Sequence, residues 1–211
     1  MSRAQVISLC RALFAALTLV AIAVQMVDLA GKGILNPVNY FSYFTIDSNL
    51  IAVAVLLAGA TAWDGASPRR LDILRGAAVV YMSITGIVFT LLLSNTDVDT
   101  AIPWVNTVVH ELMPLVILAD WLLAPPTARL NMRQGVLWLS FPLLWIAYTL
   151  IRGGIVNHYP YPFLNPANGG YASVSVYCIG ILVAMLIVCF VTVALANAAG
   201  GGRHRAEHDD G

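Results

Sequence analysis

Two polar side chains interrupt apolar stretches of this sequence at positions suited to acyl-transfer chemistry. Thr45 lies in the apolar stretch 41–63, and His110 lies in the apolar stretch 104–124. A threonine hydroxyl becomes an effective nucleophile when a base removes its proton, and a neutral imidazole is suited to that task. Polar groups are costly in lipid, so a histidine in a membrane-spanning stretch is a functional-site hypothesis by default. We therefore expect Thr45 and His110 to form a catalytic pair.

Further polar residues near these two positions are candidates to support the pair. Helical spacing places Asn106 on the same face as His110, and Asn49 on the same face as Thr45. A group behind the imidazole would orient it, and donors near the acyl carbonyl would stabilise its developing negative charge. The candidates for orienting, oxyanion-binding or substrate-binding roles are Asn106, Asn49, Ser48, Asp47, Glu111 and Arg152.

Each of these residues also has an ordinary structural interpretation. A threonine in a membrane helix commonly donates to a carbonyl of its own helix or joins two helices, and a histidine can bridge helices in the same way. Asp47 and Glu111 can be solvated near the interface or paired with Arg152, which can itself extend to water. No metal site is expected, because His110 is the one histidine in an apolar stretch and a zinc hydrolase needs about three protein ligands. The chemistry requires no cofactor.

The composition predicts an all-α membrane protein. Of the 211 residues, 59% are hydrophobic and 10% are charged, and the mean hydropathy is +0.80. Stretches of about 18 or more apolar residues are candidate transmembrane helices. We expect a bundle of six such helices within residues 1–199, and a disordered cytoplasmic tail at 200–211. An alternative for the first stretch is a cleaved signal peptide, although its apolar part is long for one. The six stretches are about 11–27, 41–63, 73–93, 104–124, 134–151 and 172–197.

The distribution of basic residues predicts the orientation. Only Lys32 and Arg152 lie on one side of the predicted bundle, and the remaining arginines lie on the other. Basic residues accumulate in cytoplasmic segments, so we expect both termini to be cytoplasmic. Polar residues gather at the outer ends of the stretches, whereas the inner halves are almost entirely apolar, so the expected site lies near the outer leaflet. The external segment 153–170 has tyrosines that suit an interfacial aromatic belt, and it could cap the outer mouth of the bundle.

Three short segments around these residues carry a family resemblance. In them the chain resembles the androgen-induced and androgen-dependent TFPI-regulating membrane proteins, which have many six-span bacterial relatives. The resemblance covers nearly the whole chain in span order. The segments are Tyr43-Phe44-Thr45-Ile46-Asp47-Ser48-Asn49, Asn106-Thr107-Val108-Val109-His110 with Pro114, and Tyr161-Pro162-Phe163-Leu164.

This resemblance implies an intramembrane threonine hydrolase that cleaves fatty acid esters of hydroxy fatty acids. The nucleophile of the family falls on Thr45, and its histidine falls on His110. The offset from Thr45 to the next acidic residue differs from that expected of the animal members, which leaves Ser48 as an alternative nucleophile. The resemblance also places the protein in a bacterial plasma membrane.

The sequence thus predicts a lipid-ester hydrolase that acts on a membrane lipid or another fatty acyl ester. The zero formal charge and the lack of a basic patch give no indication of nucleic-acid binding, and no soluble partner is implied. An alternative is a non-catalytic lipid-binding or transport protein that relays protons through Asp47, His110 and Glu111. The nearly apolar inner halves count against transport. A third interpretation is a structural subunit whose polar residues join helices.

Overall fold

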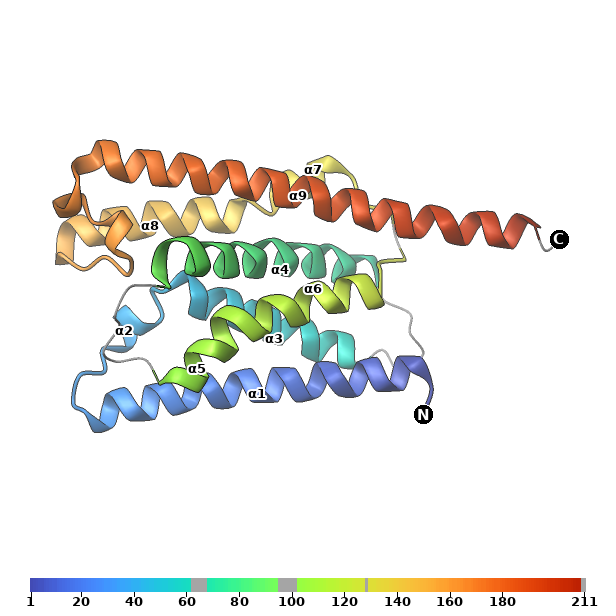
Figure 1. The fold of residues 1–211 in the computed structure, drawn as a ribbon, viewed down its shortest axis with the longest axis horizontal. Coiled ribbons are helices and arrows are strands. Elements are labelled where there is room, and N and C mark those ends of the chain that lie inside the picture. The colour runs from blue at the N-terminus through green and yellow to red at the C-terminus, as the bar shows by residue number, and fades with distance from the viewer. Residues whose placement is uncertain (62–67, 95–101, 128, 210–211) are drawn as a thin grey trace.

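The computed structural model is an elongated bundle of roughly antiparallel helices (Figure 1). It describes residues 1–61, 68–94, 102–127 and 129–209, with side chains as far as residue 198. These residues form helices, turns and loops and no β-strand. The prediction of an all-helical chain is therefore confirmed for the described residues.

The helices follow the apolar stretches closely, with short interruptions inside several of them. A π-helical turn, η1, extends α4, and another, η2, joins α5 to α6 without a break. The elements are α1 (Arg3–Gly31), α2 (Pro37–Tyr40), α3 (Phe44–Ala60), α4 (Arg69–Val88), η1 (Phe89–Leu93), α5 (Pro103–Thr107), η2 (Val108–Leu112), α6 (Met113–Leu123), α7 (Met132–Leu137), α8 (Ser140–Val156), the 3-10 turns η3 (Pro162–Leu164) and η4 (Pro166–Asn168), and α9 (Gly170–Asp209). The division at residue 199 into a membrane domain and a disordered tail stays a prediction.

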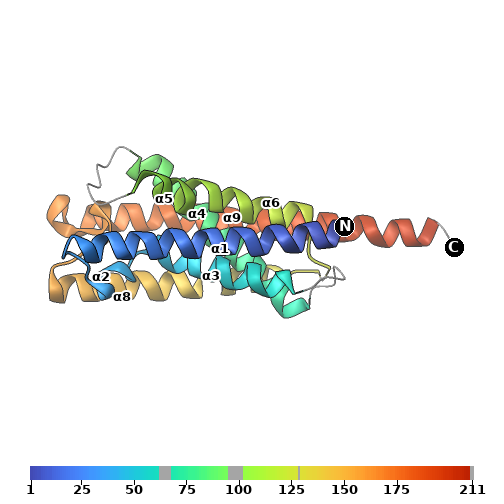
Figure 2. The ribbon, with the colours of Figure 1, turned by 90° about the horizontal axis from the view of Figure 1, so that it is seen from below.

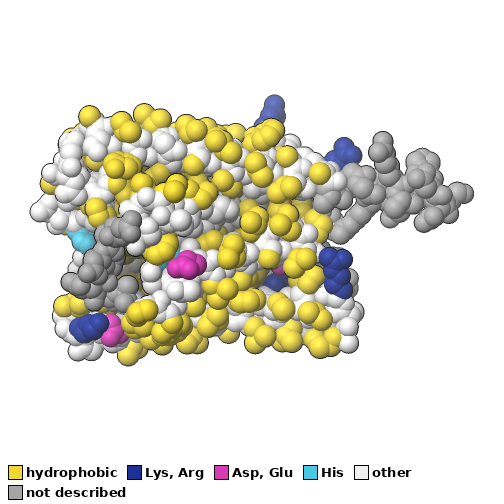
Figure 3. Space-filling model, in the orientation of Figure 1, with side chains coloured by type: hydrophobic (Ala, Val, Ile, Leu, Met, Phe, Trp, Pro, Cys, Tyr) yellow, Lys and Arg dark blue, Asp and Glu magenta, His cyan; other side chains and the backbone are white. Residues whose placement is uncertain are grey.

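Among the described residues, five helical segments are long and apolar enough to cross a membrane, as in an integral membrane protein. The second predicted stretch corresponds to α3, which has 17 residues and is about 25 Å long, against a hydrocarbon thickness of about 30 Å. Hydrophobic side chains are spread over the whole length of the face seen in Figure 3, and charged side chains on it are few. The five segments are Arg3–Gly31, Arg69–Leu93, Pro103–Leu123, Met132–Val156 and Gly170–Ala198.

Helix α4 lies at the centre of the bundle, between α8 and α9 on one side and α1, α3 and α6 on the other (Figures 1 and 2). Its central side chains, among them Ala78, Val80 and Met82, are fully buried. Helix α1 begins, and α9 ends, at the same end of the bundle, which we call the terminal end. The segment 157–169 and α2 lie at the opposite end, which we call the loop end.

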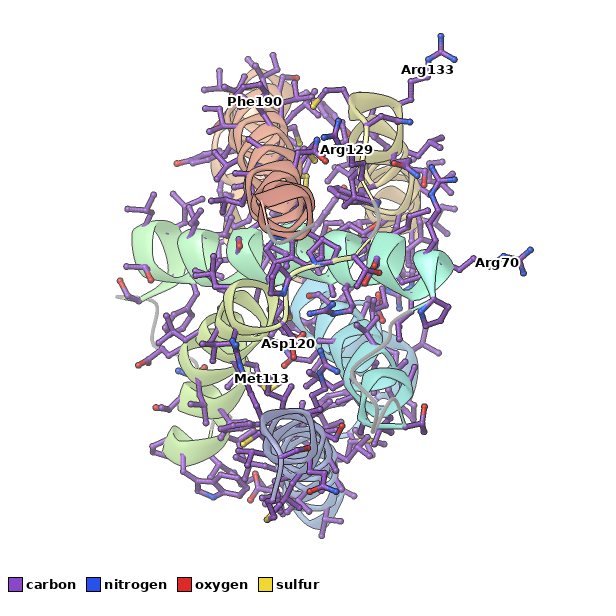
Figure 4. All side chains as sticks on the ribbon, turned by 90° about the vertical axis from the view of Figure 1, so that its right-hand side faces the viewer. Arg70, Met113, Asp120, Arg129, Arg133 and Phe190 are labelled. Carbon is purple, nitrogen blue, oxygen red and sulfur yellow. The ribbon has the colours of Figure 1, made fainter. Side chains whose placement is uncertain are left out.

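A buried ion-pair network joins four helices toward the terminal end. Asp120 on α6 accepts from Arg11 Nε at 2.6 Å and from Arg75 Nη2 at 2.8 Å. Arg75 also contacts Asp72 Oδ1 at 3.3 Å, and Arg11 donates to the Gly59 carbonyl of α3 at 2.9 Å. Figure 4 shows Asp120 pointing into the bundle, whereas Arg70 and Arg133 project away from it.

This network corrects the expectation that the inner halves of the helices are almost entirely apolar. Hydropathy averaged over about 18 residues is insensitive to a single charged side chain in an otherwise apolar stretch. The positions of Arg11 and Arg75 in the sequence predict cytoplasmic charges, yet both side chains are less than a tenth exposed.

Candidate functional site

The structure brings Thr45 and His110 together, although 65 residues separate them in the sequence. Thr45 Oγ1 lies 3.2 Å from His110 Nε2. Thr45 is in the first turn of α3, which begins at Phe44, and it is buried. His110 lies in the π-helical turn η2. The predicted contact between nucleophile and base is therefore within hydrogen-bond reach.

The second ring nitrogen determines which way the hydrogen bonds run. His110 Nδ1 lies 3.2 Å from the backbone carbonyl of Asn106. A carbonyl only accepts, so in the neutral imidazole Nδ1 carries the hydrogen and Nε2 is the acceptor. The hydroxyl of Thr45 consequently donates to Nε2, which is the direction that general-base catalysis requires. The ring of Phe89 stacks on the imidazole at 4.3 Å between centroids and fixes its plane.

Tyr161 is the third member of this arrangement, and sequence reasoning missed its role. Its hydroxyl lies 3.1 Å from Thr45 Oγ1 and accepts from the Thr45 backbone N–H, also at 3.1 Å. Because the Thr45 hydroxyl donates to His110, Tyr161 is the donor to Thr45 Oγ1. The segment 153–170 was interpreted as an aromatic belt, but Tyr161 points inward and is buried. The signal that could have identified it is its place in the motif Tyr161-Pro162-Phe163-Leu164.

Burial keeps the Tyr161 hydroxyl protonated at neutral pH. Desolvation raises the pKa of Tyr161 to about 12, and the nearby Tyr43 and Asp47 also raise it. The two hydrogen bonds with Thr45 act in the opposite direction, toward a lower pKa, and do not cancel the effect of burial. Tyr161 is therefore a hydrogen-bond donor over the whole physiological pH range.

The π-helical turn and a close helix contact set the position of His110. Pro114 has no backbone N–H, so it cannot donate to the His110 carbonyl as a continuous α-helix would require. Single π-helical turns of this kind recur at functional sites. On the facing helix α4, a Cβ atom on Gly86 would lie 3.2 Å from Pro114 Cβ and 3.5 Å from the His110 carbonyl oxygen. The absence of a side chain at Gly86 lets α4 and η2 approach closely.

Three predicted supporting residues lie beside the pair, with their hydrogen bonds directed to the backbone. Asn49 Nδ2 donates to the Thr45 carbonyl at 2.8 Å and to the Val109 carbonyl at 3.0 Å, which ties α3 to η2. Ser48 donates to the Phe44 carbonyl and lies 3.0 Å from Thr85 Oγ1, so its hydrogen bonds lead away from His110. Asn106 contributes its backbone carbonyl, and not its side-chain amide, to the imidazole.

The three charged candidates lie farther out. Asp47 is partly buried and close enough to influence the pKa of Tyr161. Glu111 is exposed, and Arg152 donates to Asn39 Oδ1 at 2.6 Å at the loop end. None of the three forms a hydrogen bond or ion pair with Thr45 or His110 among the described residues. No group of three His, Cys, Asp or Glu side chains in this part of the chain is placed to hold a metal ion.

A cavity of about 200 Å³ opens next to Thr45 and Tyr161. Apart from these two side chains and Thr85, it is lined almost entirely by apolar groups of α4, α8 and α9. Two of its lining residues, Leu143 on α8 and Ile179 on α9, are 51% and 62% exposed. The cavity therefore reaches the lipid-facing surface between α8 and α9. Further lining residues are Phe44, Ile84, Trp145, Ile146, Leu182 and Met185.

Comparisons of the chain with models of protein families, with curated proteins and with solved structures find no match. The functional interpretation accordingly depends on the geometry of the site. Its central elements are a threonine hydroxyl that donates to a neutral imidazole, a tyrosine hydroxyl that donates to the threonine, and an apolar cavity beside both.

Proposed function

We propose that this protein is a membrane hydrolase that cleaves fatty acyl esters, with Thr45 as nucleophile and His110 as general base. One observation carries the proposal: the Thr45 hydroxyl lies between His110 Nε2 at 3.2 Å and the Tyr161 hydroxyl at 3.1 Å, at the wall of an apolar cavity. A threonine that only joined helices would need neither the imidazole in this tautomer nor an adjacent space for hydrocarbon.

The reaction would proceed through an acyl-enzyme. Thr45 Oγ1 attacks the acyl carbonyl while its proton moves to His110 Nε2, and the alcohol leaves with that proton. A water molecule then attacks the acyl-threonine and gives a proton to His110. The fatty acid departs as the proton returns to Thr45 Oγ1. As Oγ1 bonds to the acyl carbon, the Tyr161 hydroxyl can turn its one hydrogen from Oγ1 to the carbonyl oxygen that becomes negative, and it can donate there again during the attack of water. Stabilisation of that oxygen is the interaction that contributes most in acyl transfer.

The cavity suggests how the substrate is held. Its apolar lining suits an acyl chain, and the exposed Leu143 and Ile179 mark a lateral route from the bilayer. We propose six spans, with the short α3 as the second, because α1 begins and α9 ends at one end of the bundle. The distribution of basic residues supports a cytoplasmic position for that end. The site would then face the outer leaflet of a bacterial plasma membrane. Fatty acid esters of hydroxy fatty acids are the first substrates to test.

A non-catalytic lipid-binding protein is the alternative that the cavity also supports. Because a buried ion-pair network joins the helices toward the terminal end, their inner halves are not almost entirely apolar, and this composition no longer counts against transport. The two arginines and two aspartates of the network are, however, paired with one another, so they form a closed set of contacts. The direction of the hydrogen bonds at Thr45 favours chemistry over binding alone.

The test is release of free fatty acid from an oleic acid ester of hydroxystearic acid by the purified protein in detergent. We expect Thr45→Ala and His110→Ala to reduce turnover by roughly a thousandfold, and Thr45→Ser to retain part of it. Thr149→Ala is the matched control, because Thr149 is buried on α8 and its hydroxyl has no partner among the described residues. The Ser48→Ala variant should retain the activity of the wild type. A loss of turnover in this variant would instead indicate that Ser48 is the nucleophile. A wild-type protein that hydrolyses no lipid ester and reacts with no fluorophosphonate probe would favour the lipid-binding alternative.

A further inference from the structure

A second hollow lies at the loop end, next to the apolar cavity. It has a volume of about 230 Å³, and the two spaces share Leu93 and Phe163 as lining residues. Unlike the first, the second hollow has a mixed lining, in which polar side chains of the segment 157–169 and the start of α9 face apolar ones. The polar lining residues are Asn165, Asn168, Ser173 and Tyr177.

Several polar atoms of this hollow remain available for a ligand. Asn165 uses Oδ1 to accept from the Ala167 backbone at 3.0 Å, and Asn168 uses Nδ2 to donate to the Pro162 carbonyl at 2.8 Å. These bonds fix the loop. The other amide atom of each asparagine, and the hydroxyls of Ser173 and Tyr177, form no hydrogen bond within the described part of the chain.

The hollow is separated from Thr45 by two stacked rings. Phe163 lies parallel to Tyr161 at 5.3 Å between centroids, with an interplanar angle of 2°. Tyr161 in turn contacts Thr45 through its hydroxyl. An ester with its carbonyl at Thr45 and its acyl chain in the apolar cavity would direct its alcohol part past Phe163. Beyond Phe163, the alcohol part would enter the second hollow.

We propose that the second hollow binds the alcohol part of the ester, and that this part is uncharged and carries hydroxyl groups, as glycerol does. The inference rests on the proposed hydrolase function and narrows its substrate: an ester of glycerol should be preferred to an ester of a hydroxy fatty acid, whose alcohol part carries a carboxylate. The lining offers neutral donors and acceptors, which match hydroxyl groups. A carboxylate or phosphate would need a cationic partner to offset its desolvation, and none of the described residues that line the hollow is Lys, Arg or His. The first turn of α9 adds only partial charges.

Two hydroxyl deletions test this assignment in the full-length protein. The double variant Ser173→Ala/Tyr177→Phe keeps the apolar part of each side chain and the ring contact between Tyr177 and Phe163. We expect its KM for monooleoylglycerol to rise roughly five- to tenfold. Its kinetics with methyl oleate, which has no hydroxyl groups to lose, should stay within about twofold of wild type. Ser175→Ala is the matched control, because Ser175 is exposed and donates to the Tyr171 carbonyl.

Adding a negative charge to the second hollow tests whether its ligand is uncharged. Asn165→Asp retains the oxygen that caps Ala167 and adds a negative charge to the hollow. With a glycerol ester, we expect kcat/KM to change less than about threefold, because the carboxylate still accepts from hydroxyl groups. The assignment is overturned if the wild type prefers the acidic hydroxystearate ester and Asn165→Asp selectively weakens that ester. It is also overturned if the double variant impairs methyl oleate and monooleoylglycerol equally. Hydrolysis of no ester at all by the wild type would instead refute the hydrolase function itself.

Discussion

Tyr161 holds the Thr45 hydroxyl in the direction that the proposed reaction needs, because it donates to Thr45 Oγ1 and accepts from the Thr45 backbone N–H. Tyr161→Phe removes both bonds and keeps the ring that stacks on Phe163. We expect kcat for ester hydrolysis to fall roughly tenfold to a hundredfold, with KM within about twofold. Tyr148→Phe, at an exposed tyrosine of α8, is the control. A kcat equal to that of wild type would exclude Tyr161 from the site.

The raised pKa of Tyr161 predicts a loss of stability at alkaline pH. In the unfolded chain the phenol ionises near pH 10, whereas in the folded protein its pKa is about 12. The folded state binds the proton more tightly, so the free energy of unfolding is unaffected below about pH 10 and falls by about 2 kcal/mol as the pH rises to about 12. Tyr161→Phe should therefore lose less thermal stability than wild type between pH 9 and pH 11.5, measured by circular dichroism in detergent. Parallel losses in the two proteins would contradict this. Tyr40 has a pKa of about 12 for the same reason, but it is present in both proteins, so its contribution cancels in the comparison.

At the scale of the helices, the contact between α4 and η2 sets the place of His110, the proposed catalytic base. A leucine at Gly86 would force Pro114 and the His110 carbonyl away from α4, because its Cβ alone would be 3.2 Å from Pro114 Cβ. We expect Gly86→Leu to lower stability by about 1–3 kcal/mol and to reduce turnover more than it lowers the fraction of folded protein. Both quantities can be measured on the same preparation, by thermal melting and by fatty acid release. Gly180→Leu is the control, since a Cβ at Gly180 on α9 would meet nothing within 4 Å. Equal behaviour of the two variants would refute the role of this contact.

The helices and the pairing of Thr45 with His110 could be predicted from the sequence, whereas the contact between Tyr161 and Thr45 could not. Apolar length predicts the helices, and two polar residues in separate apolar stretches, together with the family resemblance, predict the pair. The motif around Tyr161 marks that residue but not the atom that it contacts. The place of Tyr161 depends on how the segment 157–169 folds back over α3, 116 residues away in the sequence. The orienting group of His110 is a backbone carbonyl, and every residue has one, so no residue type marks it.

At the scale of the whole molecule, the chemistry and the strongest charge contacts lie at different levels of the bundle. His110 and Asp120 belong to one continuous helical segment, and their separation of ten positions corresponds to about 15 Å along the axis. The network of Asp120 joins α1, α3, α4 and α6, the same helices that carry or flank Thr45 and His110. It can therefore hold the helices in register for the site without touching the reacting groups.

This arrangement predicts that breaking the network unfolds the protein without changing the chemistry of the molecules that stay folded. Asp120→Asn leaves Arg11 without a carboxylate partner and Arg75 with Asp72 alone, and a buried charge without its partner costs about 3–5 kcal/mol. We expect a large fall in melting temperature, while kcat per folded molecule stays within about twofold. Lys32→Ala breaks an ion pair of similar length, at 2.7 Å from Asp28, on a side chain that is 48% exposed, and should cost less than about 1 kcal/mol. If Asp120→Asn instead leaves stability intact and abolishes turnover, the network takes part in the reaction, and a proton-relay function would have to replace its structural role.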